Sequence, residues 1–93
     1  MSIAHHPRTT LAEEVRTATL AWVAELLEEP EVELEDSFLE LGGHSALALQ
    51  LGEYAKERFG DEYDLMVLFE QPLGRAADEL SARLTAAATA EAA

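Results

Sequence analysis

The chain has 93 residues, of which 48% are hydrophobic and none is cysteine, so one small domain with a packed core is expected. Disulfide frameworks, thiolate chemistry and cysteine-based zinc sites are excluded. Nineteen acidic residues against six basic ones give a net charge of −13, which repels nucleic acid and anionic membranes and favours basic partner surfaces. Because there is neither a membrane-spanning apolar run nor a secretory signal, we expect a cytoplasmic protein that binds neither nucleic acid nor membrane.

The two ends of the chain are expected to be tails. We predict a flexible N-terminal tail over residues 1–8, a domain over residues 9–88, and a C-terminal tail over residues 89–93 that follows a fraying helix. His5 and His6 lie in the N-terminal tail, and two adjacent histidines alone are a weak metal signal. No metal site is predicted.

The first predicted helix begins after Thr10 and ends before Pro30. Thr10 and Glu13 have the spacing of a capping box, in which each side chain bonds the other residue's backbone N–H. Pro30 cannot continue the helical hydrogen bonds, and the charges of Glu28 and Glu29 are unfavourable at a helix C-terminus, so fraying is expected there. The helical spacing of the apolar residues predicts one buried stripe, made of Leu11, Val15, Ala18, Trp22 and Leu26.

The connection over residues 30–44 is long for an unstructured segment in so small a domain. We expect a short turn in it, capped by Asp36 or Ser37. Apolar residues spaced along the connection are predicted to pin it to the core: Val32, Leu34, Phe38, Leu39 and Leu41.

Three further helices are predicted. The second runs over 45–58 and has a core face of Ala48, Leu51, Ala55 and Phe59, with Gly52 expected to permit a close helix crossing. The apolar run Leu65 to Phe69 is predicted to be one short helix, because no second strand is available to pair with it. The last helix begins after Pro72 and buries Leu73, Ala77, Leu80, Leu84 and Ala87. The predicted fold is all-α, a small bundle of three longer helices and one short helix.

The stretch "LELGGHSALALQL" places one serine, Ser45, between a Gly-Gly pair and the second helix. Serine is a preferred N-cap, so Ser45 can simply cap that helix. A nucleophile is the second interpretation, but the G-x-S-x-G elbow needs a glycine where Leu47 stands and a histidine after the serine. All three histidines precede Ser45, and no acid is placed to orient His44, so no catalytic residue is predicted.

A carrier is the third interpretation of Ser45. A serine on a glycine turn at a helix start is accessible to another protein's active site, and the helix N-terminus favours the negative charge of an attached phosphodiester. Leu47 and Leu49 lie off the core stripe, and with Ala46 they would leave apolar surface beside the serine for a docking partner.

The string "DSFLELGGHSALALQL" resembles the core motif of peptidyl carrier proteins, the thiolation domains of nonribosomal peptide synthesis. The segment "DLMVLFEQPLGRAADEL" resembles the third and fourth helices of the same family, and the resemblance covers residues 11–85. It implies an acyl-carrier-protein-like fold in which a phosphopantetheinyl transferase uses coenzyme A and magnesium to attach phosphopantetheine to Ser45. The residues Gly42, Gly43 and His44 are then the flanking motif.

The same resemblance implies that the arm's thiol carries an aminoacyl or peptidyl group as a thioester. The expected partners are the phosphopantetheinyl transferase, an adenylation enzyme, and condensation or tailoring enzymes. We expect a monomer, free-standing rather than cut from a larger synthase. The predicted partner-facing residues are Ala46, Leu47, Leu49, Gln50, Glu53, Met66 and Phe69, with core packing as the other interpretation of Phe69.

Several positions depart from the family pattern. Ala46 and Gly52 replace larger residues, and Leu73-Gly74 replaces Thr-Val, which removes a natural helix cap. His44 is not a departure: fatty-acid and polyketide carriers typically have aspartate there, and Gly-Gly-His-Ser resembles the peptidyl class. These changes leave the resemblance to a carrier in place. Two alternatives stay open: an acyl carrier for a polyketide or fatty acyl group, and an acidic helical adaptor without covalent cargo.

Overall fold

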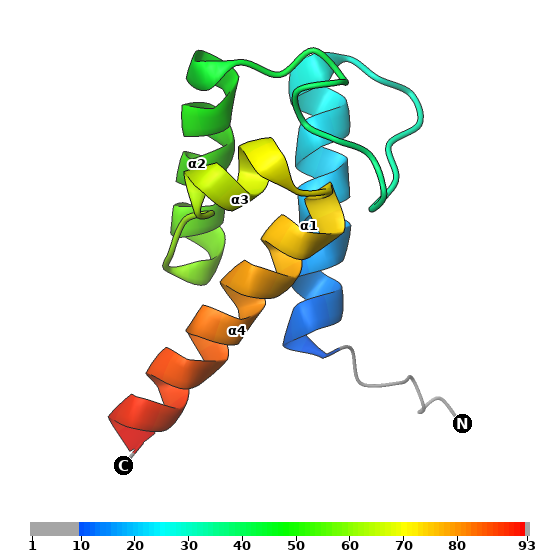
Figure 1. Ribbon diagram of the computed structural model, residues 1–93. Coiled ribbons are helices and arrows are strands. Elements are labelled where there is room, and N and C mark those ends of the chain that lie inside the picture. Colours follow the sequence, from blue (N-terminus) through cyan, green and yellow to red (C-terminus); the bar gives the residue numbers. More distant parts are fainter. Residues whose placement is uncertain (1–9, 93) are drawn as a thin grey trace, which may run out of the picture.

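Four α-helices make up the part of the chain that the computed structural model describes, residues 10–92. They are α1 (Leu11–Leu27), α2 (Ser45–Phe59), α3 (Leu65–Glu70) and α4 (Leu73–Ala92). α1 and α2 lie side by side and antiparallel, α3 lies across them, and α4 crosses the bundle diagonally (Figure 1). The all-α prediction of three longer helices and one short helix is confirmed.

The start of α1 is the predicted capping box. The Glu13 N–H donates to Thr10 Oγ1 at 3.1 Å, and the Thr10 N–H donates to Glu13 Oε1 at 3.0 Å. The helix ends at Leu27, because Glu28 adopts a left-handed conformation with φ 55°. At the other end of the chain α4 continues to Ala92, so it includes most of the residues that the sequence assigned to a C-terminal tail. The predicted tail over residues 1–8, with His5 and His6, lies outside the described residues.

The buried face of α1 differs from the predicted stripe. Val15 and Ala18 are buried as expected, but Leu11, Trp22 and Leu26 are only half-buried. α1 packs against both α4 and α2, and this turns Thr19 and Val23 to the centre of the core. The prediction missed Thr19 because its hydroxyl marks it as polar.

Phe38 is the main anchor of the connection between α1 and α2, since its side chain is fully buried in the core. Val32 and Leu41 pack against the same core as half-buried side chains. The prediction for Leu39 is wrong: this side chain is 49% exposed. Asp36 and Ser37 shape turns as expected, since the Asp36 carboxylate accepts from Glu33 N–H at 2.8 Å and Ser37 Oγ accepts from Glu40 N–H at 3.3 Å.

The first turn of α4 is capped by backbone carbonyls of the same connection. The N–H of Leu73 donates to the Asp36 carbonyl at 2.9 Å, and the N–H of Gly74 donates to the Leu34 carbonyl at 2.8 Å. These bonds satisfy two of the first N–H groups of α4, which have no partner within the helix. A Cβ at residue 74 would lie 3.1 Å from the Cβ of Leu34, so glycine lets the connection approach. The Leu73-Gly74 departure thus has a structural reason.

Gly52 is buried, but no helix crosses it. A Cβ at this position would meet the Glu62 side chain, with Oε1 at 3.2 Å, so the loop between α2 and α3 covers the glycine. Arg83 of α4 holds this loop in place. Its guanidinium donates to the Asp61 carboxylate at 2.6 Å and to the Glu62 carbonyl at 2.7 Å. The predicted role of Gly52 in a helix crossing is therefore wrong.

Candidate functional site

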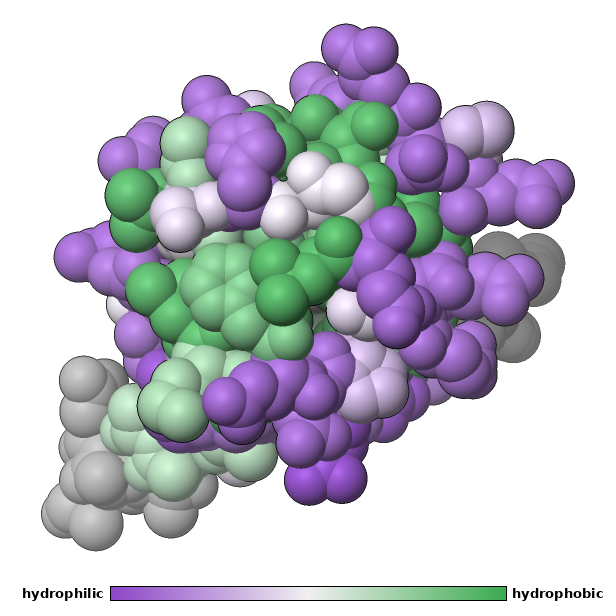
Figure 2. All heavy atoms as spheres, turned by 45° about the horizontal axis from the view of Figure 1, so that its top comes forward, coloured by the Kyte–Doolittle hydropathy of each residue, from purple (hydrophilic) through white to green (hydrophobic). Residues whose placement is uncertain are grey.

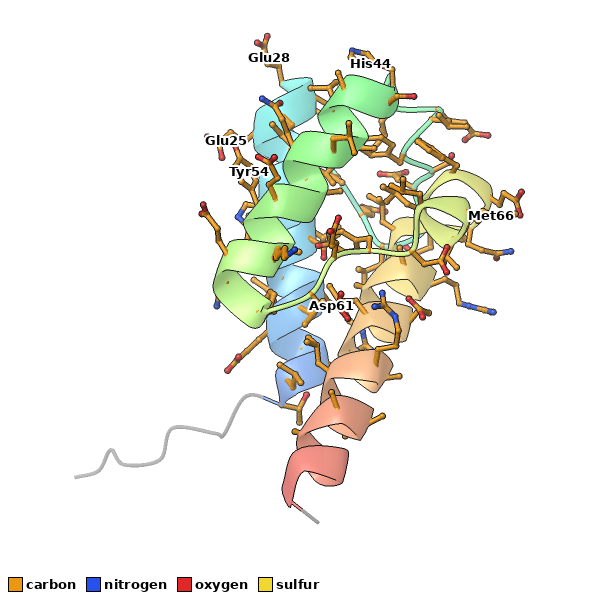
Figure 3. The ribbon with its side chains drawn as sticks, turned by 90° about the vertical axis from the view of Figure 1, so that its left-hand side faces the viewer. Glu25, Glu28, His44, Tyr54, Asp61 and Met66 are labelled. Carbon is orange, nitrogen blue, oxygen red and sulfur yellow. The ribbon has the colours of Figure 1, made fainter. Side chains whose placement is uncertain are left out.

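Ser45 is exposed and is the first residue of α2. The N-cap position belongs to His44, whose side chain is also exposed and makes no cap hydrogen bond. Figure 3 shows His44 at the N-terminal end of the helix. The interpretation of Ser45 as the cap is therefore wrong: its hydroxyl lies one position further on, at the open end of the helix.

The Gly-Gly pair before Ser45 forms a tight turn. Gly42 has φ +104°, a conformation that side chains other than glycine rarely adopt. The turn is closed by three backbone hydrogen bonds, in which Leu41, Gly42 and Gly43 donate to the carbonyls of Ser37, Leu39 and Phe38 at 3.0, 3.0 and 2.9 Å. Ser45 is thus presented by an ordered segment.

The start of α2 is suited to an anion. The first intrahelical hydrogen bond runs from the Ala48 N–H to the His44 carbonyl at 2.9 Å, so the N–H groups of residues 45–47 have no helical partner. The first turn contains no acidic residue, although the chain carries a net charge of −13. Free N–H groups and the positive end of the helix dipole stabilise a phosphate at this place. These residues fit a phosphodiester on Ser45.

The predicted partner-facing residues divide into two groups. Ala46, Leu49, Gln50, Glu53 and Met66 are exposed, and for the two large apolar side chains, Leu49 and Met66, the exposed fraction reaches 58% and 65%. Leu47 and Phe69 are half-buried against the core. The centroid of the Phe69 ring lies 6.1 Å from the centroid of the Phe38 ring. Core packing is therefore a sufficient explanation of Phe69.

Two further exposed apolar residues were not predicted as part of this surface. Leu39 and Leu65 are 49% and 43% exposed. Hydrophobic side chains gather on the face that Figure 2 shows, which includes the end of the molecule where α2 begins. No sequence signal identifies Leu65, because it lies three residues before the buried Leu68 and helical spacing would place both side chains on one face. For Leu39 only the burial of its neighbour Phe38 identifies it, because successive residues of a turn point in different directions.

Neither metal-binding clusters nor membrane-spanning helices are found among residues 10–92. No group of three or more His, Cys, Asp or Glu side chains is arranged to hold a metal ion in this part of the chain. No helix there has the length and hydropathy that crossing a bilayer requires.

Comparison with known proteins connects this geometry to a family. Residues 18–72, more than half of the chain, match the family described as "Phosphopantetheine attachment site". The chain is 41% identical over 66 residues to a linear gramicidin synthase protein of Brevibacillus parabrevis, which covers 71% of the chain and 1% of that protein. It is 46% identical over 48 residues to a dimodular nonribosomal peptide synthase of Bacillus subtilis strain 168, which covers 52% of the chain and 2% of that protein.

A third relative is another linear gramicidin synthase protein of Brevibacillus parabrevis, with 47% identity over 49 residues, or 53% of the chain and 1% of that protein. The chain thus spans only a small fraction of the length of these curated relatives. The extent of the family match and the four-helix fold together show that the chain belongs to the phosphopantetheine attachment site family and is a carrier domain, whose cofactor is covalently attached phosphopantetheine.

Proposed function

We propose that this chain is a peptidyl carrier protein, which holds an aminoacyl or peptidyl group as a thioester on a phosphopantetheine arm attached to Ser45. One observation supports this assignment above the others: Ser45 is exposed at the first position of α2, in a helical turn without acidic residues. The similarity to nonribosomal peptide synthases favours an aminoacyl cargo over a fatty acyl one.

The chemistry of attachment asks little of the carrier itself. Ser45 Oγ forms the ester bond to phosphorus while the pyrophosphate bond of coenzyme A breaks and adenosine bisphosphate leaves, and the hydroxyl proton passes to the transferase. The turn at Gly42 and Gly43 exposes the hydroxyl, and the N–H groups at the start of α2 stabilise the phosphodiester. When bound, the arm supplies the reach and the thiol that a chain without cysteine lacks.

The proposed partners are a phosphopantetheinyl transferase, an adenylation enzyme, and condensation or tailoring enzymes. Leu49 and Met66 would provide apolar contacts at their docking site, because large side chains that stay exposed in a monomer are free to be buried by a partner. Ala46, Gln50 and Glu53 would lie beside them. The free-standing and monomeric state and the cytoplasmic location stay predictions.

The assignment is tested by sequential loading. The chain is incubated with coenzyme A, magnesium and a promiscuous phosphopantetheinyl transferase, and intact mass reports the modification. The modified chain is then offered amino acids, ATP and an amino-acid adenylating enzyme, or an acyl-CoA with an acyltransferase. We expect aminoacyl loading. Acyl loading alone would instead show that the chain is a carrier for a polyketide or fatty acyl group. A chain that stays unmodified would favour the alternative of an acidic helical adaptor without covalent cargo.

Replacement of Leu49 by glutamine is expected to raise the KM of the adenylation enzyme for the carrier by roughly tenfold, because an apolar contact at the centre of an interface is replaced by a polar group. Stability should change by no more than about 0.5 kcal/mol, since Leu49 is exposed and glutamine is a good helix former. Glu57→Gln is the matched control, because Glu57 is exposed near the other end of α2. An unchanged KM in Leu49→Gln would contradict the docking role.

A further inference from the structure

The ring of Phe38 lies directly against the backbone of Gly43, two residues before Ser45. Phe38 is fully buried, and a Cβ added at Gly43 would lie only 2.6 Å from Cζ of its ring, with Cδ2 and Cε2 closer still. Because protein interiors are close-packed, the ring fills the space that any side chain at residue 43 would need. The backbone joins the same two residues, since the Gly43 N–H donates to the Phe38 carbonyl at 2.9 Å.

The ring of Phe38 cannot easily move aside to make room. Its centroid lies 6.1 Å from that of Phe69 on α3. The preceding residues are bound to the start of α4. Ser37 forms an isolated antiparallel β-bridge with Pro72, and the Asp36 carbonyl accepts a hydrogen bond from the Leu73 N–H at 2.9 Å. A displacement of Phe38 would therefore disturb both α3 and α4.

The position of Gly43 determines where α2 begins. The next residue, His44, is the N-cap, with an extended backbone (φ −143°, ψ −179°), and its carbonyl accepts the first helical hydrogen bond from Ala48. Ser45 follows directly. A shift of the backbone at residue 43 would thus move the first turn of α2 and the hydroxyl with it.

We propose that Phe38 and Gly43 are a pair of positioning residues for the modification of Ser45, in which the ring sets the path of the backbone and so the place of Oγ in the transferase. This inference rests on the proposed function, since it assumes that Ser45 is the residue modified. It assigns Gly43 a role that differs from that of Gly42, because Gly42 has open space around it and needs only its positive φ.

The first test is Gly43→Ala. We expect its kcat/KM as a transferase substrate to fall by about tenfold or more per folded molecule, because a misplacement of about 1 Å is enough to slow a reaction strongly. In the unmodified protein, amide exchange of Ala48 should accelerate more than that of Ala55, in the middle of α2. The control is Leu80→Ala, which removes a fully buried side chain from α4 and should lower stability without a change localised to the first turn of α2.

The second test is rescue. Phe38→Val removes Cδ2, Cε2 and Cζ, which are the atoms that a Cβ at residue 43 would meet. The double variant Phe38→Val/Gly43→Ala is therefore expected to be modified within about threefold of the rate of Phe38→Val alone. Because the rate is taken per folded molecule, a purely destabilising role for the two residues predicts no slowing in Gly43→Ala and leaves nothing for the double variant to rescue.

The outcomes separate this inference from the proposed function. If the wild-type chain is not modified, the proposed function fails. The amide exchange of Ala48, compared between the wild type and Gly43→Ala, then still reports whether Phe38 and Gly43 position the first turn of α2. If the wild-type chain is modified and Gly43→Ala matches it in rate and in exchange, the positioning role is wrong. If Gly43→Ala does not fold, the comparison of Phe38→Val with the double variant decides, and a double variant that is unfolded or slow overturns the proposal.

Discussion

Replacement of Ser45 by alanine is expected to abolish phosphopantetheine attachment completely while the free energy of unfolding changes by no more than about 0.5 kcal/mol. The reason for the loss is chemical, because the variant has no oxygen on which the phosphodiester can form. The reason for the unchanged stability is structural. Ser45 is exposed and is not the N-cap of α2, and alanine is the best helix former at an exposed helical position.

Intact mass after incubation with coenzyme A and transferase measures the first effect, and urea denaturation measures the second. Ser37→Ala is the matched control, because Ser37 lies eight residues earlier in the same segment and its hydroxyl accepts a backbone hydrogen bond from Glu40. This control should be modified fully. A phosphopantetheine mass on Ser45→Ala would show that the arm is attached elsewhere and would remove the basis of the proposed function.

The largest stability effect of a single polar group is expected at Thr19. Its hydroxyl lies in the core, donates to the Val15 carbonyl at 2.6 Å and lies 2.5 Å from the hydroxyl of Tyr63. Since threonine has one hydroxyl hydrogen and it is used on Val15, Tyr63 is the donor in the second bond. Thr19→Val keeps the shape but leaves the Tyr63 hydroxyl buried without an acceptor, which costs about 1–3 kcal/mol.

The companion variant Tyr63→Phe should cost less, about 1 kcal/mol, because the Thr19 hydroxyl keeps its own acceptor. The double variant Thr19→Val/Tyr63→Phe should be more stable than Thr19→Val alone, since neither hydroxyl is then left unsatisfied. Urea denaturation of the four proteins at neutral pH measures this cycle. Strictly additive losses would contradict the hydrogen bond between the two side chains.

High pH should weaken the fold through the same tyrosine. Burial raises the pKa of Tyr63 from 10.0 to about 12. Between these two values the unfolded chain has released the phenolic proton while the folded chain keeps it. The unfolded state then binds fewer protons, so stability is complete below about pH 10 and falls by up to about 1.4 kcal/mol per pH unit as pH rises toward 12.

Urea denaturation at a series of pH values from about 9 to 12 measures this loss. Tyr63→Phe should lack this pH-dependent loss, and the difference in slope between the two proteins isolates the contribution of Tyr63 from that of every other group in the chain. Equal slopes in the wild type and in Tyr63→Phe would show that Tyr63 ionises without penalty in the folded protein.

Local sequence signals were sufficient for the helices and for the candidate site. The capping box of Thr10 and Glu13 depends only on residues three apart, and both of its hydrogen bonds are present. Helical spacing after Pro72 predicted α4, and the Gly-Gly-His-Ser string indicated Ser45 as the candidate attachment residue. Such signals work because a helix and a turn are stabilised by bonds between residues close in sequence.

The errors have a common origin in the packing of the folded chain, which the spacing of residues along one segment does not report. Leu39 was expected to anchor the connection, but the core there is filled by Phe38. Gly52 was expected at a helix crossing, but the loop containing Glu62 covers it. Thr19 was not expected in the core, because its burial depends on Tyr63, which lies 44 residues later. No periodicity along one segment contains this information.

The sequence by itself therefore determined the helices, their order, the absence of cysteine and the serine that stands at the start of α2. Only the tertiary structure decided how that serine is presented. The turn before it follows from the fit of Gly43 against Phe38, and the start of α4 from carbonyls of Leu34 and Asp36. The place of Phe38 depends on its packing against Phe69 of α3, and the start of α4 depends on a connection more than 30 residues earlier in the chain. A pattern read in one segment cannot report where another segment comes to lie.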